Sequence, residues 1–198
     1  MNSFAEKGYT IVKGFLDLEE TVRISKYLEN CVNRKACSTR TGEENITDQP
    51  SRFYYYADPL IELILEEKTK EIEEIVNLPL YPTYSFMRVY VDSDALRKHT
   101  DRPECEYSVT VHVAKVGKDW PICIKDIHGN DNKIILDQGD ALVYRGCDLL
   151  HWRDPMKQCG TDLNAQFMLH YVEKDGPYSI CKFDRRPKLG LSDSFKAR

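Results

Sequence analysis

The stretch TYSFMRVYV, residues 83–91, begins a half of the chain that is predicted to consist of β-strands. It follows the helix-breaking segment NLPLYP at 77–82 and is rich in β-branched and aromatic residues, which favour strands. Similar short runs come after it, separated by turn signals such as Gly139-Asp140. They are YSVTVHVAKV at 107–116, WPICIKDI at 120–127, NKIILD at 132–137, ALVYRG at 141–146 and NAQFMLHYV at 164–172.

Two helices are predicted before this β-rich half. The first starts from Asp17 as N-cap, with Glu20 in the capping-box position. The second starts at Asp58-Pro59, an N-cap followed by a proline at the first helical position, and continues through LIELILEEKTKEIEEIVN at 60–77. One apolar stripe of the first helix is expected to face the core, and it consists of Leu18, Val22, Leu28, Cys31 and Val32.

Helices followed by many closely spaced strands indicate an α+β fold. We expect a double-stranded β-helix, or jelly-roll, core with the N-terminal helices packed on one of its sheets. The chain length is typical of one domain, 1–198, divided into a helical portion 1–80, a β core 81–182 and a tail 183–198. The polar segment 34–53 has no sustained periodicity, so it is predicted to be a long loop and, like the tail, a candidate lid.

Composition excludes several classes of protein. The sequence has no run of about 18 apolar residues, which a membrane-spanning helix would need. Its 28 basic and 32 acidic residues give a net charge of −4 without long blocks of one sign, so nucleic acid is not an expected partner. Seven scattered cysteines without a C-x-x-C pattern fit reduced thiols, and the N-terminus does not resemble a secretory signal. We therefore expect a cytoplasmic protein.

Three residues form a candidate metal site. His99 and Asp101 stand two positions apart in RKHTDRPECE at 97–106, and in an extended chain such residues point to the same side. His151 follows a Gly-Asp turn and an apolar strand. Two histidines and one carboxylate are the ligands of the facial triad that holds non-haem Fe(II) with open positions. The alternative for His99 and Asp101 is an exposed turn, because an H-x-D pattern alone is weak.

The sequence resembles the 2-oxoglutarate- and Fe(II)-dependent dioxygenases, in particular their prolyl-4-hydroxylase-like branch. Tyr90 stands nine residues before His99, and Pro155 stands four residues after His151, as in that branch. FMLHYV at 167–172 is similar to its last core strand, and GYTIVKGFL at 8–16 to its entry.

The resemblance implies an enzyme that uses Fe(II), O2 and 2-oxoglutarate to hydroxylate a C–H bond of a peptidyl or small-molecule substrate. His99, Asp101 and His151 would be the metal ligands and catalytic residues, and Tyr90 would contact 2-oxoglutarate. An aspartate ligand, rather than a small residue that leaves space for halide, favours hydroxylation over halogenation.

One feature departs from that branch. Its basic residue for the distal carboxylate of 2-oxoglutarate lies about ten residues after the second histidine, where this chain has Gly-Thr-Asp-Leu at 160–163. Arg153 is the first replacement candidate, because it lies two residues beyond His151 on the same side of an extended strand, and Arg88 is the second. Arg145 is a weaker candidate at a turn.

Several alternatives stay open. Tyr90 could be a core aromatic residue, and Arg153 could pair with Asp154 or Glu106. His112 and His170, within predicted strands, are expected to be structural. The whole chain could instead be a cupin-like metal enzyme that does not use 2-oxoglutarate, or a non-enzymatic jelly-roll binding module.

Overall fold

The computed structural model describes residues 3–33, 53–91, 93–156 and 163–196. The candidate lid at 34–53 lies outside these residues except for Phe53, and so do Gly160, Thr161 and Asp162. The described helices are α1 (Ser3–Lys7), α2 (Leu18–Asn33) and α3 (Pro59–Val76), with short 3-10 turns η1 (Pro103–Cys105), η2 (Ser179–Arg185) and η3 (Asp193–Phe195).

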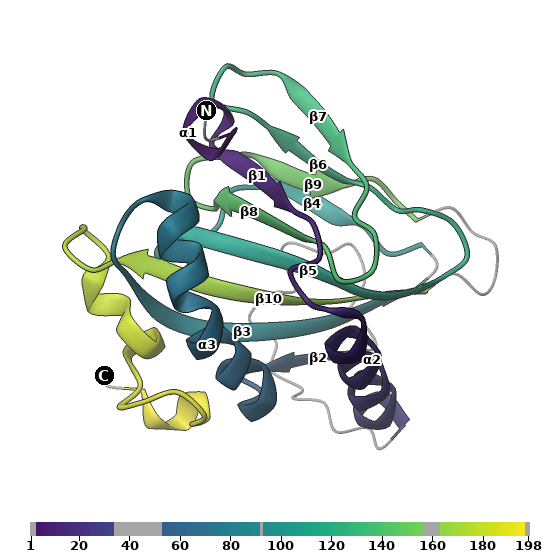
Figure 1. Cartoon of the computed structure of the whole chain (residues 1–198), viewed down its shortest axis with the longest axis horizontal. Coiled ribbons are helices and arrows are strands. Elements are labelled where there is room, and N and C mark those ends of the chain that lie inside the picture. The colour runs from purple at the N-terminus through teal and green to yellow at the C-terminus, as the bar shows by residue number, and fades with distance from the viewer. Residues whose placement is uncertain (1–2, 34–52, 92, 157–162, 197–198) are drawn as a thin grey trace.

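The described strands form two antiparallel sheets (Figure 1). The large sheet has the order β1 (Tyr9–Val12), β8 (Ala141–Arg145), β5 (Tyr107–Val116), β10 (Leu163–Glu173), β3 (Leu80–Val91) and β2 (Phe53–Tyr56). The small sheet has the order β4 (Leu96–His99), β9 (His151–Arg153), β6 (Ile122–Lys125) and β7 (Asp131–Ile134). This is the jelly-roll arrangement, so the predicted α+β fold is confirmed.

The two faces of the large sheet have different chemistry because successive residues of a strand point to opposite sides. Val109 and Val111 of β5 and Phe167 of β10 belong to the core shared with residues of α2 and α3. Both helices therefore pack on the large sheet, as predicted. The intervening residues face the small sheet and are mostly polar; they include Ser108, Thr110, His112, Asn164, Gln166 and His170. The part of the space between the sheets that β5 and β10 face is thus lined by buried hydrogen-bonding groups.

The predicted core stripe of α2 is wrong in part. The buried residues of α2 are Thr21, Ile24, Leu28 and Cys31, whereas Leu18 is 81% exposed and Val22 and Val32 are also exposed. At 100° per residue, Val22 lies almost opposite Ile24 around the helix, so the two cannot both face the sheet. The capping prediction is consistent with the structure, since the Asp17 carboxylate accepts the Glu20 N–H and the Glu20 carboxylate accepts the Asp17 N–H.

The described part of the predicted tail packs against β3 and α3. Arg186 is buried and forms a two-pronged ion pair with Glu62 of α3, at 2.5 Å from Nη2 to Oε1 and 3.2 Å from Nη1 to Oε2. The Arg186 guanidinium also donates to the Thr83 carbonyl of β3 at 2.9 Å. The C-terminal segment is therefore part of the folded core. None of the described helices is long and apolar enough to cross a bilayer.

Loss of the Arg186–Glu62 pair is expected to destabilise the fold strongly. In Arg186→Leu the Glu62 carboxylate, 1% exposed, loses its cation, which typically costs about 3–5 kcal/mol of unfolding free energy. Urea unfolding measures the loss. The control is Arg23→Ala, which removes an exposed pair with Glu19 and should change stability by about 0.5 kcal/mol or less. Equal effects of the two substitutions would contradict the prediction.

Candidate functional site

The structure brings together the three residues of the candidate metal site. His99 ends β4 and His151 begins β9, and the two are direct partners in the ladder of the small sheet. Oδ1 of Asp101 lies 3.5 Å from Nε2 of His99 and 3.4 Å from Nε2 of His151. One possible ligand atom from each of the three residues lies within 4.8 Å of the other two. This is close enough for the three to share one ion.

Both imidazoles are turned in the way that a metal ligand needs. Nδ1 of His99 lies 2.7 Å from the Arg97 carbonyl, and Nδ1 of His151 lies 3.0 Å from the Leu149 carbonyl. A carbonyl only accepts, so each Nδ1 donates to it and each Nε2 is the ring nitrogen directed at Asp101. His151 is buried, while the side chains of His99 and Asp101 are 16% and 13% exposed. The site therefore has one side open to solvent.

Asp101 is held in its anionic form. Burial alone would raise the pKa of Asp101, but the charge and hydrogen bonds of His151 and His99 hold it well below its usual range. The donor set is thus one carboxylate and two imidazoles, which suits a divalent transition metal such as Fe(II).

A hydrogen-bonded group behind Asp101 was not anticipated from the sequence. The Ser108 hydroxyl donates to Oδ2 of Asp101 at 2.8 Å, and Nδ1 of His170 lies 3.0 Å from the same hydroxyl oxygen. Burial lowers the pKa of His170 to about 4, so its ring is neutral at pH 7. The alternation of polar and apolar residues in YSVTVHV and NAQFMLHYV does place both residues on the inner face, and that pattern is the signal that was available.

Arg153 lies deeper between the two sheets. Its guanidinium donates through Nη1 to the Trp120 carbonyl at 2.5 Å and through Nη2 to Oε1 of Gln166 on β10 at 3.0 Å, and it stacks 4.9 Å from the Trp120 ring centre. Burial lowers the pKa of Arg153 to about 10, which leaves it charged at pH 7. It pairs with neither of the carboxylates suggested by the sequence.

Those two carboxylates have other partners. Asp154 pairs with Lys133 at 3.1 Å, and the Glu106 carboxylate accepts the backbone N–H of Glu173 at 2.8 Å. Arg153 is therefore a buried cation held by neutral acceptors.

Tyr90 and Arg88 are also buried and lie side by side on β3. The Arg88 guanidinium is 4.8 Å from the centre of the Tyr90 ring, and that ring meets Trp120 edge-on at 4.9 Å. Tyr90 packs in a small cluster with Trp120 and Met156, and its co-substrate role stays a prediction. Arg145 is half-buried near Phe4, on the helix-facing side rather than beside Arg153.

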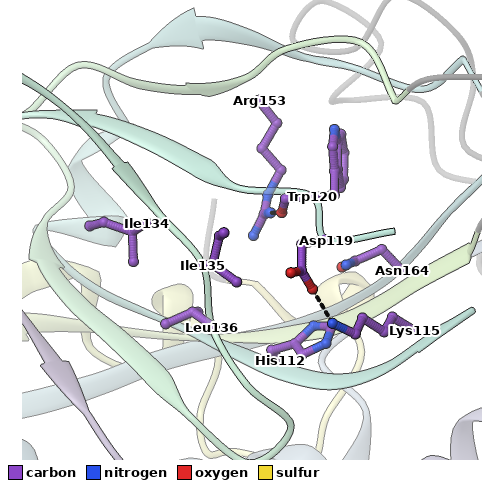
Figure 2. A pocket seen from close by; sticks show the side chains of 9 residues that line it. All are labelled: His112, Lys115, Asp119, Trp120, Ile134, Ile135, Leu136, Arg153 and Asn164. Carbon is purple, nitrogen blue, oxygen red and sulfur yellow. Dashed lines mark hydrogen bonds and ion pairs between the residues drawn. The ribbon is translucent and has the colours of Figure 1, made fainter. Parts of the chain in front are cut away.

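A pocket opens beside Arg153. Figure 2 shows the Arg153 side chain reaching toward it from one side and the His112 imidazole lying on the other. Among the described residues, Nε2 of His112 is buried with no hydrogen-bond partner. A guanidinium and an unpaired imidazole nitrogen across one pocket suit a polar, anionic group. The lining residues are His112, Lys115, Asp119, Trp120, Ile134, Ile135, Leu136, Arg153 and Asn164.

His112 makes stability depend on mildly acidic pH. Burial, aided by the charge of Arg153, lowers its pKa from 6.5 to about 4 in the folded chain. Between these values the unfolded chain binds more protons than the folded chain. The unfolding free energy therefore decreases as the pH is lowered, by about 2 kcal/mol from pH 7 to pH 5 for this group. Urea unfolding at both pH values measures this loss. His112→Gln should lose correspondingly less, and an unchanged pH dependence in that variant would contradict the assignment.

Comparison with known proteins identifies the fold of the chain. No family model and no curated protein matches the sequence. A Pseudomonas putida prolyl-4-hydroxylase matches in structure with a TM-score of 0.68 and 12% identity, covering 86% of this chain and 95% of that one. HygX from Streptomyces hygroscopicus, solved with nickel and 2-oxoglutarate bound, gives 0.65 and 13%, covering 87% and 85%. The α-ketoglutarate-dependent epimerase SnoN of nogalamycin biosynthesis gives 0.70 and 13%, covering 96% and 86%.

The chain has the fold of the 2-oxoglutarate-dependent oxygenases. The resemblance identified from Tyr90, His99, Asp101 and His151 is thereby confirmed for the fold, over most of the chain. At 12–13% identity the shared property is this oxygenase fold itself, so the roles of individual side chains depend on their own geometry.

Proposed function

We propose that the protein is a non-haem Fe(II) and 2-oxoglutarate-dependent dioxygenase that hydroxylates a C–H bond of a peptidyl or small-molecule substrate. The observation that carries the proposal is the convergence of His99, Asp101 and His151 on one point at the open rim of an oxygenase fold. Nickel and 2-oxoglutarate in the HygX structure support the same type of cofactor here.

The residues present fit an iron ion. His99 and His151 would bind through Nε2 and Asp101 through Oδ1, the atoms that already face one another. Three protein ligands leave positions for a chelating co-substrate and for oxygen. When bound, the metal supplies oxygen activation coupled to the decarboxylation of 2-oxoglutarate. The protein contributes ligand geometry and, through the buried side of His151, exclusion of water.

Arg153 is the proposed partner of the distal carboxylate of 2-oxoglutarate. It lies two residues beyond His151 on β9, so it is placed one step deeper on the same side as that ligand. After its bonds to Trp120 and Gln166, the guanidinium retains N–H groups for a carboxylate, because it carries five in total. Tyr90 and Arg88 would border the same space from β3, and the unpaired His112 would face it from β5.

One observation favours a second candidate, a cupin-like metal enzyme without 2-oxoglutarate. Along the described part of β10, the inward side chains are Asn164, Gln166, Met168 and His170, so this strand provides no cation for a co-substrate. The two candidates differ in whether any 2-oxoglutarate is consumed. The non-enzymatic binding module is a third outcome, in which metal binds without turnover.

Hydroxylation and the substrate class are the most specific parts of the proposal. Structural neighbours include a prolyl-4-hydroxylase and an epimerase, and another HygX structure contains hygromycin B. The named activities differ and one structure holds hygromycin B, so the substrate class here is left at a peptidyl residue or a small metabolite. The aspartate at the middle ligand position supports hydroxylation over halogenation.

The deciding experiment is uncoupled turnover of 2-oxoglutarate. Protein reconstituted anaerobically with Fe(II) is given 2-oxoglutarate and then oxygen, and succinate is measured. We expect succinate at a slow rate even without a primary substrate, and a weak visible charge-transfer band before oxygen is added. Metal binding without succinate or band would favour the cupin-like candidate or the binding module over this proposal.

A further inference from the structure

The two oxygens of the Asp101 carboxylate have different surroundings. Oδ1 faces Nε2 of both His99 and His151, at 3.5 and 3.4 Å. Oδ2 points the other way and accepts the Ser108 hydroxyl at 2.8 Å. One oxygen is thus directed at the metal position while the other is engaged by the large sheet.

His170 is the second partner of the Ser108 hydroxyl. A serine hydroxyl has a single proton to donate. The Asp101 carboxylate can only accept, so this proton is directed to Oδ2, and Nδ1 of His170, 3.0 Å from Ser108 Oγ, is then the donor to the hydroxyl oxygen. The Cys105 carbonyl, at 3.2 Å, is its more distant acceptor. Ser108 is 0% and His170 6% exposed, which keeps water from competing for these bonds.

Gly146 closes the same side of Asp101 by contact. A Cβ added there would lie 2.4 Å from Oδ2 of Asp101, 2.2 Å from the Cys105 carbonyl oxygen and 2.8 Å from Ser108 Oγ. None of these distances is tolerable without movement of the carboxylate or its neighbours. The Gly146 carbonyl also accepts the Asp101 N–H at 2.8 Å. Glycine is therefore required here because the Cys105 carbonyl and the Asp101 carboxylate together occupy the space of a side chain.

We propose that His170, Ser108 and Gly146 are positioning residues that make Asp101 a ligand through Oδ1 alone. This inference rests on the proposed metal-binding function and deepens it. A carboxylate whose second oxygen is hydrogen bonded and enclosed does not turn to ligate through both oxygens. Ligation through one oxygen leaves the remaining positions open for co-substrate and oxygen, which the chemistry of a three-ligand site needs.

The test measures metal affinity without turnover. Anaerobic titration with Mn(II), followed by the EPR signal of the free ion, gives the dissociation constant. Ser108→Ala removes the donor to Oδ2 but keeps all three ligands, and we expect its dissociation constant to rise about 10–100-fold, the usual range for an outer partner of a metal ligand. His170→Leu should weaken binding in the same direction. His170→Asn retains an N–H donor near Nδ1 and should recover most of the affinity.

Two further variants make the result specific. Ser85→Ala is the matched control: Ser85 is fully buried on β3 and its hydroxyl has no hydrogen-bond partner among the described residues, so the Mn(II) dissociation constant should not change. Gly146→Ala keeps the Ser108 side chain but adds a Cβ that crowds Oδ2 of Asp101, the Cys105 carbonyl and Ser108 Oγ, and it should weaken binding as well. Circular dichroism and a thermal melt confirm that each variant is folded.

The outcomes separate this inference from the proposed function. If the unmodified protein binds Mn(II) and folded Ser108→Ala binds it equally well, the positioning role is overturned while the metal site stands. If the unmodified protein does not bind Mn(II), both are overturned. If Ser85→Ala weakens binding as much as Ser108→Ala, the effect is one of general packing, and the positioning role is again overturned.

Discussion

Replacement of Asp101 by alanine is expected to abolish metal binding at concentrations that saturate the unmodified protein. Asp101 supplies the anionic donor of the set, and its Oδ1 is the atom toward which both imidazole Nε2 atoms converge. Its loss should raise the metal dissociation constant by more than the roughly 10–100-fold that is typical when a residue hydrogen bonded to a metal ligand is removed. The measurement is anaerobic titration with Fe(II) and 2-oxoglutarate, monitored by the visible charge-transfer band.

The control for this substitution is Asp137→Ala. Asp137 is an exposed aspartate that pairs with Lys13 at 2.8 Å, and its loss removes the same charge from the protein surface. We expect its titration to match that of the unmodified protein. A band of equal strength in Asp101→Ala would rule out His99, Asp101 and His151 as the iron site.

Replacement of Arg153 by leucine is expected to weaken 2-oxoglutarate binding by about 30-fold or more. Removing one partner of a buried charge pair typically costs about 2–5 kcal/mol, and no other cation lies on the described inward face of β10. Arg153→Lys keeps the charge but loses the two-pronged geometry, so it should be intermediate. The readout is the KM for 2-oxoglutarate in the succinate assay, together with the Mn(II) dissociation constant, which should stay near that of the unmodified protein.

Arg88→Leu is the informative comparison for Arg153→Leu. Both arginines are buried in the same part of the barrel, at 4% exposure each, so both substitutions bring a similar loss of packing and charge. If Arg153 holds the co-substrate, the KM rises much more in Arg153→Leu than in Arg88→Leu. The reverse order would assign the carboxylate to Arg88 and contradict the prediction.

The strands and the three clustered residues were within reach of sequence reasoning for physical reasons. Runs such as YSVTVHVAKV alternate strictly enough that only a half-polar, half-apolar strand explains them. His99 and Asp101 are two residues apart, which fixes their common side locally. The proximity of His151 to these two residues depends on the fold, which the resemblance to a known family indicated.

Other features depended on information that a single sequence does not contain. The buried face of α2 was ambiguous, because Val22 and Ile24 are both apolar and only the position of the large sheet selects between them. The bond between Ser108 and His170 depends on the register of β5 against β10, in which the two residues are direct partners. The partners of Arg153 come from Trp120 and Gln166, residues whose proximity follows from the closure of the two sheets.

The placement of the three candidate ligands has a consequence for the molecule as a whole. His99 and His151 belong to the small sheet, whereas the Asp101 carboxylate is hydrogen bonded to Ser108 of the large sheet. An ion shared by the three would be a cross-link between the two layers of the barrel at one rim. Separation of the layers would then require release of the ion, so occupancy of the site and resistance of that rim to local opening would rise and fall together.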